Sequence, residues 1–222
     1  MNYEIGIIQM DLSNYREHYD LAELNEPLPE DPMQLFKDWL SEAIMDGRLK
    51  EPNAMSLGTA TSEGIPSVRI VLFKEVRERG LVFYTNYNSA KGREISANPN
   101  VAATVWWPEM ERQVRFTGKA SKISPDDSTE YFHSRPRGSQ LGAIVSPQSD
   151  EIPNKRFLER KLNKADRSFE GVEKLDRPEH WGGYYIEASK LEFWQGRPNR
   201  LHDRIEYLLD SDENWSRRRL AP

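Results

Sequence analysis

The feature that most constrains the fold is a series of short strand-like segments joined by tight turns. The predicted strands are residues 55–61, 67–74, 81–85, 101–107, 113–123, 183–188, 191–194, 201–209 and 215–220. Ser62-Glu63-Gly64 and Pro108-Glu109 separate neighbouring strands by a few residues, as in hairpins. Strands and helices do not alternate regularly, so an antiparallel barrel or sandwich is favoured over a parallel doubly wound sheet.

Helices are predicted between these strands. They cover residues 31–47, 90–97, 124–135, 139–145 and 155–169. In the first, Asp31 can cap the N-terminus, Pro32 suits the first turn and Gly47 suits the end. The expected fold class is therefore α+β, an antiparallel β-barrel with peripheral helices. Residues 1–30 are acidic, end in a proline-rich stretch and predict a flexible tail, whereas residues 31–222 predict one domain.

Composition excludes several classes of protein. The chain has 222 residues and no cysteine, so disulfide frameworks, thiolate metal sites and cysteine nucleophiles are impossible. Its net charge of -5 argues against a nucleic-acid or anionic-membrane partner. The N-terminus lacks a basic signal-peptide region and no apolar stretch is long enough to span a bilayer, so a cytoplasmic location is expected. No phosphate-binding loop, dinucleotide fingerprint, metalloprotease helix or serine-hydrolase elbow is present, and no metal site is expected.

Positive charge is concentrated in a few places within this acidic chain. Arg69 and Lys74 bracket an apolar strand, a position where unpaired charges are rare. They have opposite parity, so they share a face only if the strand bends near Lys74. The alternative is an exposed edge strand that carries protective charges.

A second cationic group follows the next-to-last predicted strand. Arg200, His202 and Arg204 alternate with other residues, so a regular strand would place them on one face. Two guanidinium groups and an imidazole on one face suit a phosphate or carboxylate ligand. The alternatives are an ion pair between Arg204 and Glu206 or a solvated face whose surface pairs contribute little.

Two further segments suit anion binding at helix ends. Residues 131–139 join arginines, a proline and serines before a predicted helix, and Ser89 and Lys91 begin the helix at 90–97. Arginines that offset a helix dipole are the alternative for the first segment. Tyr84, Trp106, Trp107 and Trp194 offer flat surfaces, although each could equally be core. From the residues alone, the chain is expected to bind one or more phosphorylated, planar small molecules.

Several motifs, in order along the chain, strongly resemble the pyridoxamine 5'-phosphate oxidase family. They are residues 69–74 (RIVLFK), 83–86 (FYTN), 111–115 (ERQVR), 131–137 (YFHSRPR), 181–183 (WGG), 192–196 (EFWQG), 200–204 (RLHDR) and 219–222 (RLAP). The resemblance implies an FMN-binding split β-barrel and a homodimer with FMN in the interface. It also implies oxidation of pyridoxamine or pyridoxine 5'-phosphate to pyridoxal 5'-phosphate, with dioxygen as acceptor and hydrogen peroxide as product.

The resemblance also assigns site residues by position. Those implied for FMN are Arg69, Ile70, Val71, Leu72, Tyr84, Thr85, Lys91, Gln113, Gln148, Ser149, Trp194 and Arg204. Those implied for the substrate are Lys74, Tyr131, Arg135 and Ser139 at its phosphate, Arg200 and His202 at its ring, and Arg16 and Tyr19 as a cover. Arg200 and His202 are the residues expected nearest the reacting carbon, and so the catalytic pair.

One departure from the family pattern concerns the FMN phosphate. The family commonly has Ser-Arg-Lys where this chain has Ser89-Ala90-Lys91, so one arginine is missing, and Arg93 or a partner-chain group is a candidate replacement. Two alternative functions remain open at this stage. One is a related FMN oxidase acting on another ring, such as a phenazine precursor, and the other is a non-catalytic carrier of FMN or pyridoxal phosphate.

Overall fold

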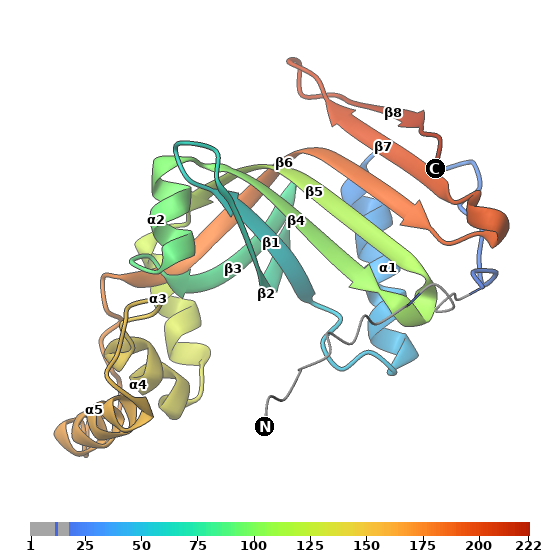
Figure 1. Ribbon diagram of the computed structural model, residues 1–222. Coiled ribbons are helices and arrows are strands. Elements are labelled where there is room, and N and C mark those ends of the chain that lie inside the picture. Colours follow the sequence, from blue (N-terminus) through green and yellow to red (C-terminus); the bar gives the residue numbers. More distant parts are fainter. Residues whose placement is uncertain (1–11, 13–17) are drawn as a thin grey trace, which may run out of the picture.

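A closed antiparallel β-barrel forms the centre of the computed structural model, which describes residues 12 and 18–222 (Figure 1). Its strands are β1 (Ala54–Ala60), β2 (Pro66–Arg77), β3 (Gly80–Asn86), β4 (Asn100–Trp107), β5 (Arg112–Lys122), β6 (Trp181–Gln195), β7 (Asp203–Leu209) and β8 (Trp215–Arg219). The strand order is β3-β2-β1-β4-β5-β6-β7-β8, and an additional β3–β6 pairing closes the barrel. β7 and β8 continue the sheet beyond β6, so the predicted antiparallel barrel with peripheral helices is confirmed.

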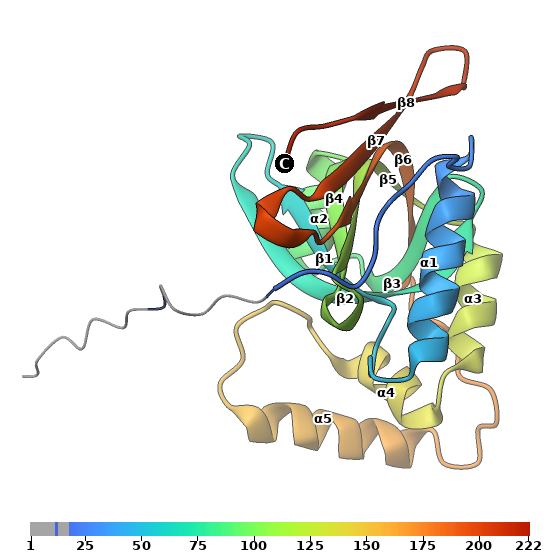
Figure 2. The same cartoon turned by 90° about the vertical axis from the view of Figure 1, so that its right-hand side faces the viewer.

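Five helices lie around the barrel. They are α1 (Pro32–Asp46), α2 (Ala90–Ala97), α3 (Pro125–Ser134), α4 (Arg137–Val145) and α5 (Lys155–Ser168). α1 begins and ends as predicted: the Asp31 side chain accepts a hydrogen bond from the N–H of Met33, and Gly47 has a φ of 72°. In Figures 1 and 2, α3, α4 and α5 gather at one end of the barrel, whereas β7 and β8 extend it at the other.

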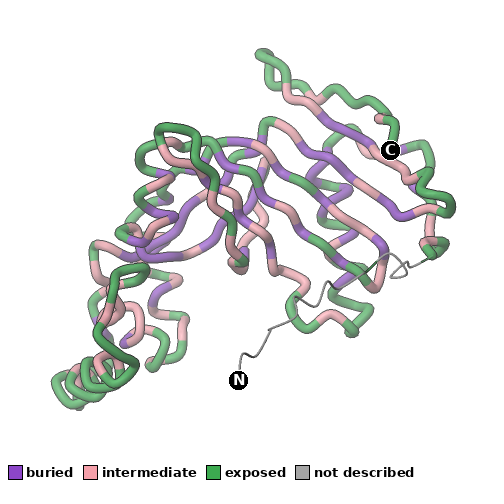
Figure 3. Tube along the Cα trace, in the orientation of Figure 1, coloured by how far each residue is buried: buried purple, intermediate pink, exposed green. Residues whose placement is uncertain are grey.

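The hydrophobic core lies inside the barrel and beneath α1. Buried and exposed residues alternate along β4, and Figure 3 shows buried stretches on the barrel strands and an exposed α5. Phe36 of α1 packs edge-on against Phe116 of β5, with ring centroids 4.9 Å apart, and Trp39 packs edge-on against Phe193 at 5.3 Å. α1 therefore stabilises the barrel by covering apolar side chains on its inner face.

β6 differs from the sequence prediction because it is one strand rather than two. The predicted break at residues 189–190 coincides with a β-bulge, where the pairing shifts between Thr117↔Lys190 and Gly118↔Ala188. Gly118 permits this close approach, since a Cβ atom there would lie 1.9 Å from the carbonyl oxygen of Glu187. A bulge interrupts the alternation of side chains without ending the strand, and so the sequence pattern breaks there.

The second half of the predicted N-terminal tail lies against the barrel. Leu24 and Leu28 are buried. The hydroxyl of Tyr207 donates to the carbonyl oxygen of Pro29 at 2.8 Å, and Arg217 donates to that of Leu28 at 2.7 Å. Residues 18–30 are thus held by contacts to β7 and β8, which are distant in sequence.

Two searches of the described residues gave negative results. Within residues 12 and 18–222, no helix combines the length and apolarity needed to cross a membrane. The same part of the chain holds no group of three acidic or histidine side chains arranged around a possible metal ion.

Candidate active site

One cavity of about 720 Å³ brings together most of the residues expected to bind phosphate groups. It lies between β2, β3 and the helices α2, α3 and α4. The expected residues that line it are Arg69, Ile70, Val71, Leu72, Lys74, Tyr84, Thr85, Lys91, Tyr131, Arg135, Ser139 and Gln148. The two predicted anion sites are therefore two parts of a single cavity.

A β-bulge explains how Arg69 and Lys74 reach the same cavity. The β2–β3 pairing shifts between Phe73↔Phe83 and Glu75↔Val82, which leaves Lys74 as an extra residue in β2. An extra residue reverses the side-chain alternation beyond it. The bend that the sequence required near Lys74 is present, and both cations line the cavity.

Arg69 and Lys91 form the first cationic group of the cavity. Lys91 is buried, and its Nζ lies 3.4 Å from the hydroxyl of Thr85 and 3.3 Å from Oε1 of Gln148. Burial, and then the nearby charge of Arg69, lower the pKa of Lys91. Arg69 donates to the carbonyl oxygen of Leu57 at 3.2 Å and to Glu94 at 3.1 Å. A buried ammonium held only by neutral oxygens suits an incoming anion.

The start of α2 fixes the position of Lys91. The Ser89 side chain caps this helix by accepting from the N–H of Gly92 and donates to the carbonyl oxygen of Asn86 at 2.7 Å. The candidate replacement for the missing arginine lies elsewhere. Arg93 is exposed, contacts the carbonyl oxygen of Asn88 and lies 3.6 Å from Asp150, and it does not line the cavity.

Lys74, Tyr131, Arg135 and Ser139 form the second polar group. The Arg135 guanidinium lies over the ring of Trp181 at 4.6 Å, and its Nη1 is buried without a hydrogen-bond partner among the described residues. Burial lowers the pKa of Arg135. An unsatisfied buried guanidinium nitrogen indicates a site built for an acceptor such as a phosphate oxygen.

Stacked aromatic rings support this second group. The rings of Tyr84 and Tyr131 are parallel with centroids 3.7 Å apart. The hydroxyl of Tyr84 donates to Glu75, and burial together with this carboxylate raises the pKa of Tyr84 well above its usual range. Tyr84 therefore stays a neutral phenol whose ring forms a wall of the cavity.

The other expected residues form a separate cluster on the outer face of β5, β6 and β7. Gln113, Trp194 and Arg204 are direct neighbours in the ladder, because Gln113 pairs with Trp194 and Trp194 pairs with Arg204. The His202 ring lies 4.6 Å from that of Trp194, and the Tyr19 ring packs edge-on against both. We call this cluster (Tyr19, Gln113, Trp194, Arg200, His202 and Arg204) the β6–β7 half-site.

The strand alternation predicted for Arg200, His202 and Arg204 is wrong. β7 begins only at Asp203, and Arg200 ends the short 3-10 helix Pro198–Arg200 with a left-handed φ of 61°. The turn, rather than a strand face, brings Arg200 and His202 beside Trp194. Such a conformation in a non-glycine residue is uncommon and is often found at functional sites.

The proposed pairing of Arg204 with Glu206 is also wrong. Arg204 donates to Glu192 of the neighbouring strand at 2.8 Å, whereas Glu206 accepts from Arg218 at 2.8 Å. Cross-strand neighbours thus take precedence over neighbours within one strand, because the sheet places them closer together.

Two expected residues fall outside both groups. Ser149 is exposed, has a left-handed φ of 75° and does not line the cavity. Arg16 lies outside the described residues. The sequence analysis missed Glu94, which binds Arg69, and gave no role to Trp181, which lies beneath Arg135. A carboxylate one helical turn from Lys91 was the available signal for Glu94.

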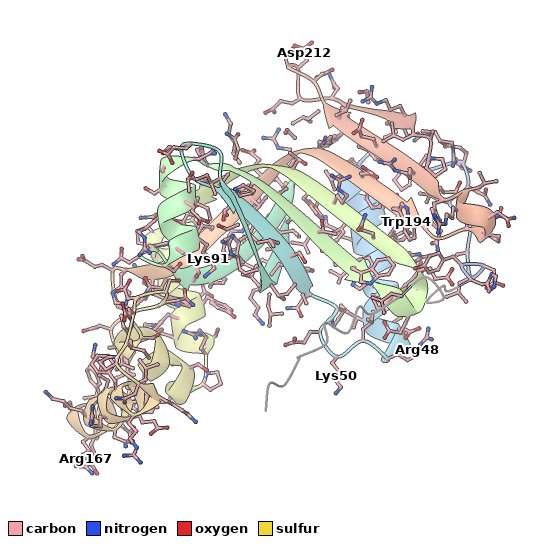
Figure 4. All side chains as sticks on the ribbon, in the orientation of Figure 1. Arg48, Lys50, Lys91, Arg167, Trp194 and Asp212 are labelled. Atoms are coloured by element: carbon pink, nitrogen blue, oxygen red, sulfur yellow. The ribbon has the colours of Figure 1, made fainter. Side chains whose placement is uncertain are left out.

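The cavity and the β6–β7 half-site are far apart in one chain. Leu72 is in β2 and Trp194 is in β6, four interstrand steps apart, or about 19 Å along the sheet. Figure 4 shows Lys91 and Trp194 at opposite ends of the barrel. One ligand ring can contact both groups only if they come from different chains.

The residues present fit FMN. The buried Lys91 beside Arg69 suits its phosphate, and Ile70, Val71 and Leu72 give a strand wall for a flat ring. The unsatisfied Nη1 of Arg135 leaves a second anion position in the same cavity. Fold and cavity together define a split-barrel protein that binds phosphorylated ring compounds.

Comparison with known families gives the narrower assignment. The pyridoxamine 5'-phosphate oxidase family model matches residues 40–167, and the pyridoxine 5'-phosphate oxidase C-terminal dimerisation region matches residues 181–222. The chain belongs to the pyridoxamine 5'-phosphate oxidase family. The dimerisation region comprises β6, β7 and β8, which carry most of the β6–β7 half-site, and the protein is a homodimer.

Individual relatives agree with this assignment. The chain is 52% identical over 212 residues to a pyridoxine/pyridoxamine 5'-phosphate oxidase of Flavobacterium johnsoniae, covering 95% of this chain and 99% of the relative. The enzyme of that name from Leptospira interrogans is 47% identical, covering 95% and 98%. Among solved structures, PhzG from Burkholderia lata, in complex with tetrahydrophenazine-1-carboxylic acid, has a TM-score of 0.84 at 30% identity, covering 91% of this chain and 100% of that one.

Proposed function

We propose that this protein is an FMN-dependent oxidase that converts pyridoxine or pyridoxamine 5'-phosphate to pyridoxal 5'-phosphate. The alcohol and dioxygen give the aldehyde and hydrogen peroxide. The amine, dioxygen and water give the aldehyde, ammonia and hydrogen peroxide. The observation that carries this proposal is the single cavity with two separate cationic groups, because cofactor and substrate each bring one phosphate.

FMN, when bound, supplies the two-electron chemistry and the reaction with dioxygen. Arg69 and Lys91 bind its phosphate, with Thr85 and Gln148 beside Lys91. The strand segment Ile70 to Leu72 and the ring of Tyr84 line its flat part. These contacts are neutral apart from the phosphate end, so they orient the ring without adding charge beside it.

The substrate phosphate is held by Lys74, Tyr131, Arg135 and Ser139. Fixing the phosphate at a distance from the reacting carbon restricts the motion of the pyridine ring and holds that carbon at the flavin. The half-site of the other subunit brings Arg200 and His202 to the ring, and Tyr19 covers it. Gln113, Trp194 and Arg204 of that half-site contact the flavin ring.

A related oxidase of a phenazine precursor is the second candidate. The structure of PhzG with tetrahydrophenazine-1-carboxylic acid favours it, because that chain shares the fold at 30% identity. The cavity of this protein argues for a phosphorylated substrate instead. Lys74 and Arg135 line it together, and the buried Nη1 of Arg135 has no partner among the described residues.

A spectrum and an assay test the proposal. The purified protein is expected to be yellow, with a flavin spectrum, and to release peroxide with pyridoxine or pyridoxamine 5'-phosphate. A yellow protein that releases no peroxide with either ester supports the non-catalytic carrier. Peroxide release with a dihydrophenazine carboxylic acid but neither ester supports the second candidate.

The cellular setting follows from the same chemistry. We place the enzyme in the cytoplasm, since the chain has no cysteine to use in an oxidising compartment and its substrates are small soluble esters. Its partners are a second copy, the vitamin B6 esters and dioxygen, and its acidic balance gives no electrostatic reason for a nucleic-acid or membrane partner.

A further inference from the structure

Arg197 connects three parts of the molecule that are far apart in sequence. It follows β6 directly, and its main-chain N–H donates to Nδ1 of His202 at 3.1 Å. Its side chain reaches the N-terminal segment, where it donates to the carbonyl oxygen of Ala22 at 3.2 Å and pairs with Glu23. Its Nε also lies 3.7 Å from Asp203 at the start of β7.

The main-chain contact fixes the proton of His202. A main-chain N–H can only donate, so Nδ1 of His202 must be the acceptor. A neutral imidazole has one N–H, which therefore lies on Nε2. His202 thus offers a hydrogen-bond donor at Nε2.

The side-chain contacts belong to a network that holds the N-terminal segment. Asp203 accepts from the N–H of Leu24 at 3.2 Å and pairs with Arg219 at 2.5 Å. Arg219 also donates to the carbonyl oxygen of Leu24 at 3.0 Å. An isolated exposed ion pair contributes little, but a network with main-chain acceptors restricts the segment at several points.

The segment held in this way places Tyr19 in the half-site. Tyr19 packs edge-on against Trp194 at 5.7 Å and against His202 at 5.8 Å. A Cβ atom on Gly196 would lie 2.8 Å from Tyr19, so the chain before Arg197 is in direct contact with this ring. The backbone on both sides of Arg197 therefore touches a residue of the half-site.

We propose that Arg197 is a positioning residue that ties residues 18–24 to the turn carrying His202, so that Tyr19 and the Nε2 donor of His202 are held together. The proposal rests on the proposed function for its kinetic consequence only. Breaking the side-chain contacts frees the segment and weakens substrate retention. FMN affinity is unaffected, because Arg197 does not line the FMN cavity.

Arg197→Ala, Glu23→Ala and the double variant test this proposal in the full-length dimer. Hydrogen exchange of peptides covering residues 18–28 is expected to accelerate in each single variant. KM for pyridoxine 5'-phosphate should rise about three- to tenfold while kcat and the Kd for FMN stay nearly constant. The double variant should behave like Arg197→Ala alone, and Arg197→Lys should restore part of the protection.

Arg79→Ala is the matched control. Arg79 has a similar exposure and also pairs with two carboxylates, Glu187 and Glu213, but makes no contact with residues 18–28. If Arg197→Ala exchanges and binds substrate as Arg79→Ala does, the proposal is overturned. It is equally overturned if a nitrogen-15 spectrum of neutral His202 places the proton on Nδ1. Both readouts are independent of turnover, whereas a wild-type enzyme that fails to oxidise either ester contradicts the proposed function alone.

Discussion

At the scale of single residues, buried positive charge determines which ligands the cavity accepts. Lys91 and Arg135 are both held against burial by few partners, and in each the pKa is lowered by desolvation. Such groups are costly to the protein without a ligand and gain most from an anion. The two residues lie in different parts of the cavity and lead to different expectations.

Arg135→Ala is expected to weaken binding of the phosphorylated substrate. A charge-assisted hydrogen bond contributes about 1.5–3 kcal/mol, so KM for pyridoxine 5'-phosphate should rise about ten- to hundredfold. The kcat/KM for unphosphorylated pyridoxine should change little, because it lacks the group that Arg135 binds. Peroxide release with both alcohols measures this, and exposed Arg160→Ala on α5 is the control. Equal losses with both alcohols would place Arg135 outside the phosphate site.

FMN binding is expected to depend on pH through Lys91. In the unliganded fold its pKa lies below the ordinary 10.5, and a bound phosphate dianion raises it again. Between these values binding takes up a proton, so FMN affinity should fall as the pH rises through that window. Flavin fluorescence titrations of the apoprotein from neutral to alkaline pH measure the Kd. Lys91→Gln should bind more weakly and lose this slope, and an unchanged slope would contradict the assignment.

At the scale of elements, regular patterns could be predicted from the sequence and irregularities could not. Helix α1 was predictable because its cap, first-turn proline and terminal glycine are local signals. The bulges in β2 and β6 were not, since an extra residue in a strand is fixed by pairing with a distant strand. The condition they satisfy was nevertheless visible, because Arg69 and Lys74 could share a site only if the strand bends.

The turn between β6 and β7 shows the same limit at the candidate site. The arginine–histidine alternation there imitates a strand, but Pro198 and the left-handed residues Asn199 and Arg200 form a tight turn. Residue identities were therefore informative about chemistry, whereas their geometry depended on a turn that periodicity does not detect. The contacts of residues 18–30 were unpredictable for a related reason, since every partner lies near the C-terminus.

The bulge in β6 gives a test at this scale. Gly118→Ala is expected to lower the free energy of unfolding by about 2 kcal/mol or more, because its Cβ would overlap the carbonyl oxygen of Glu187. Gly138→Ala in α4 is the matched control, since nothing lies within 4 Å of its added Cβ and alanine favours a helix. Urea unfolding of both apoproteins measures the difference. Equal stability of the two variants would mean that the bulge relaxes freely.

At the scale of the whole molecule, the dimer completes each active site. The cavity and the β6–β7 half-site lie on different parts of the barrel, and the dimerisation region carries most of the half-site. The exposed apolar residues Val68 and Ile70 of β2 lie beside the cavity. An interface formed there would cover them and enclose the ligands between two chains. Ligand binding and assembly are then linked, because each dimer holds two identical composite sites.

Complementation between two inactive variants tests this account most directly. Lys74→Ala/Arg135→Ala removes the cavity cations and Arg200→Ala/His202→Ala removes the half-site, so each homodimer should be inactive. In a mixed dimer, one site carries both sets of substitutions and the other carries neither. Unfolding and refolding an equal mixture should therefore restore about one quarter of the wild-type peroxide release. A refolded mixture that forms mixed dimers but stays as inactive as its parents would show that each site is built within one chain.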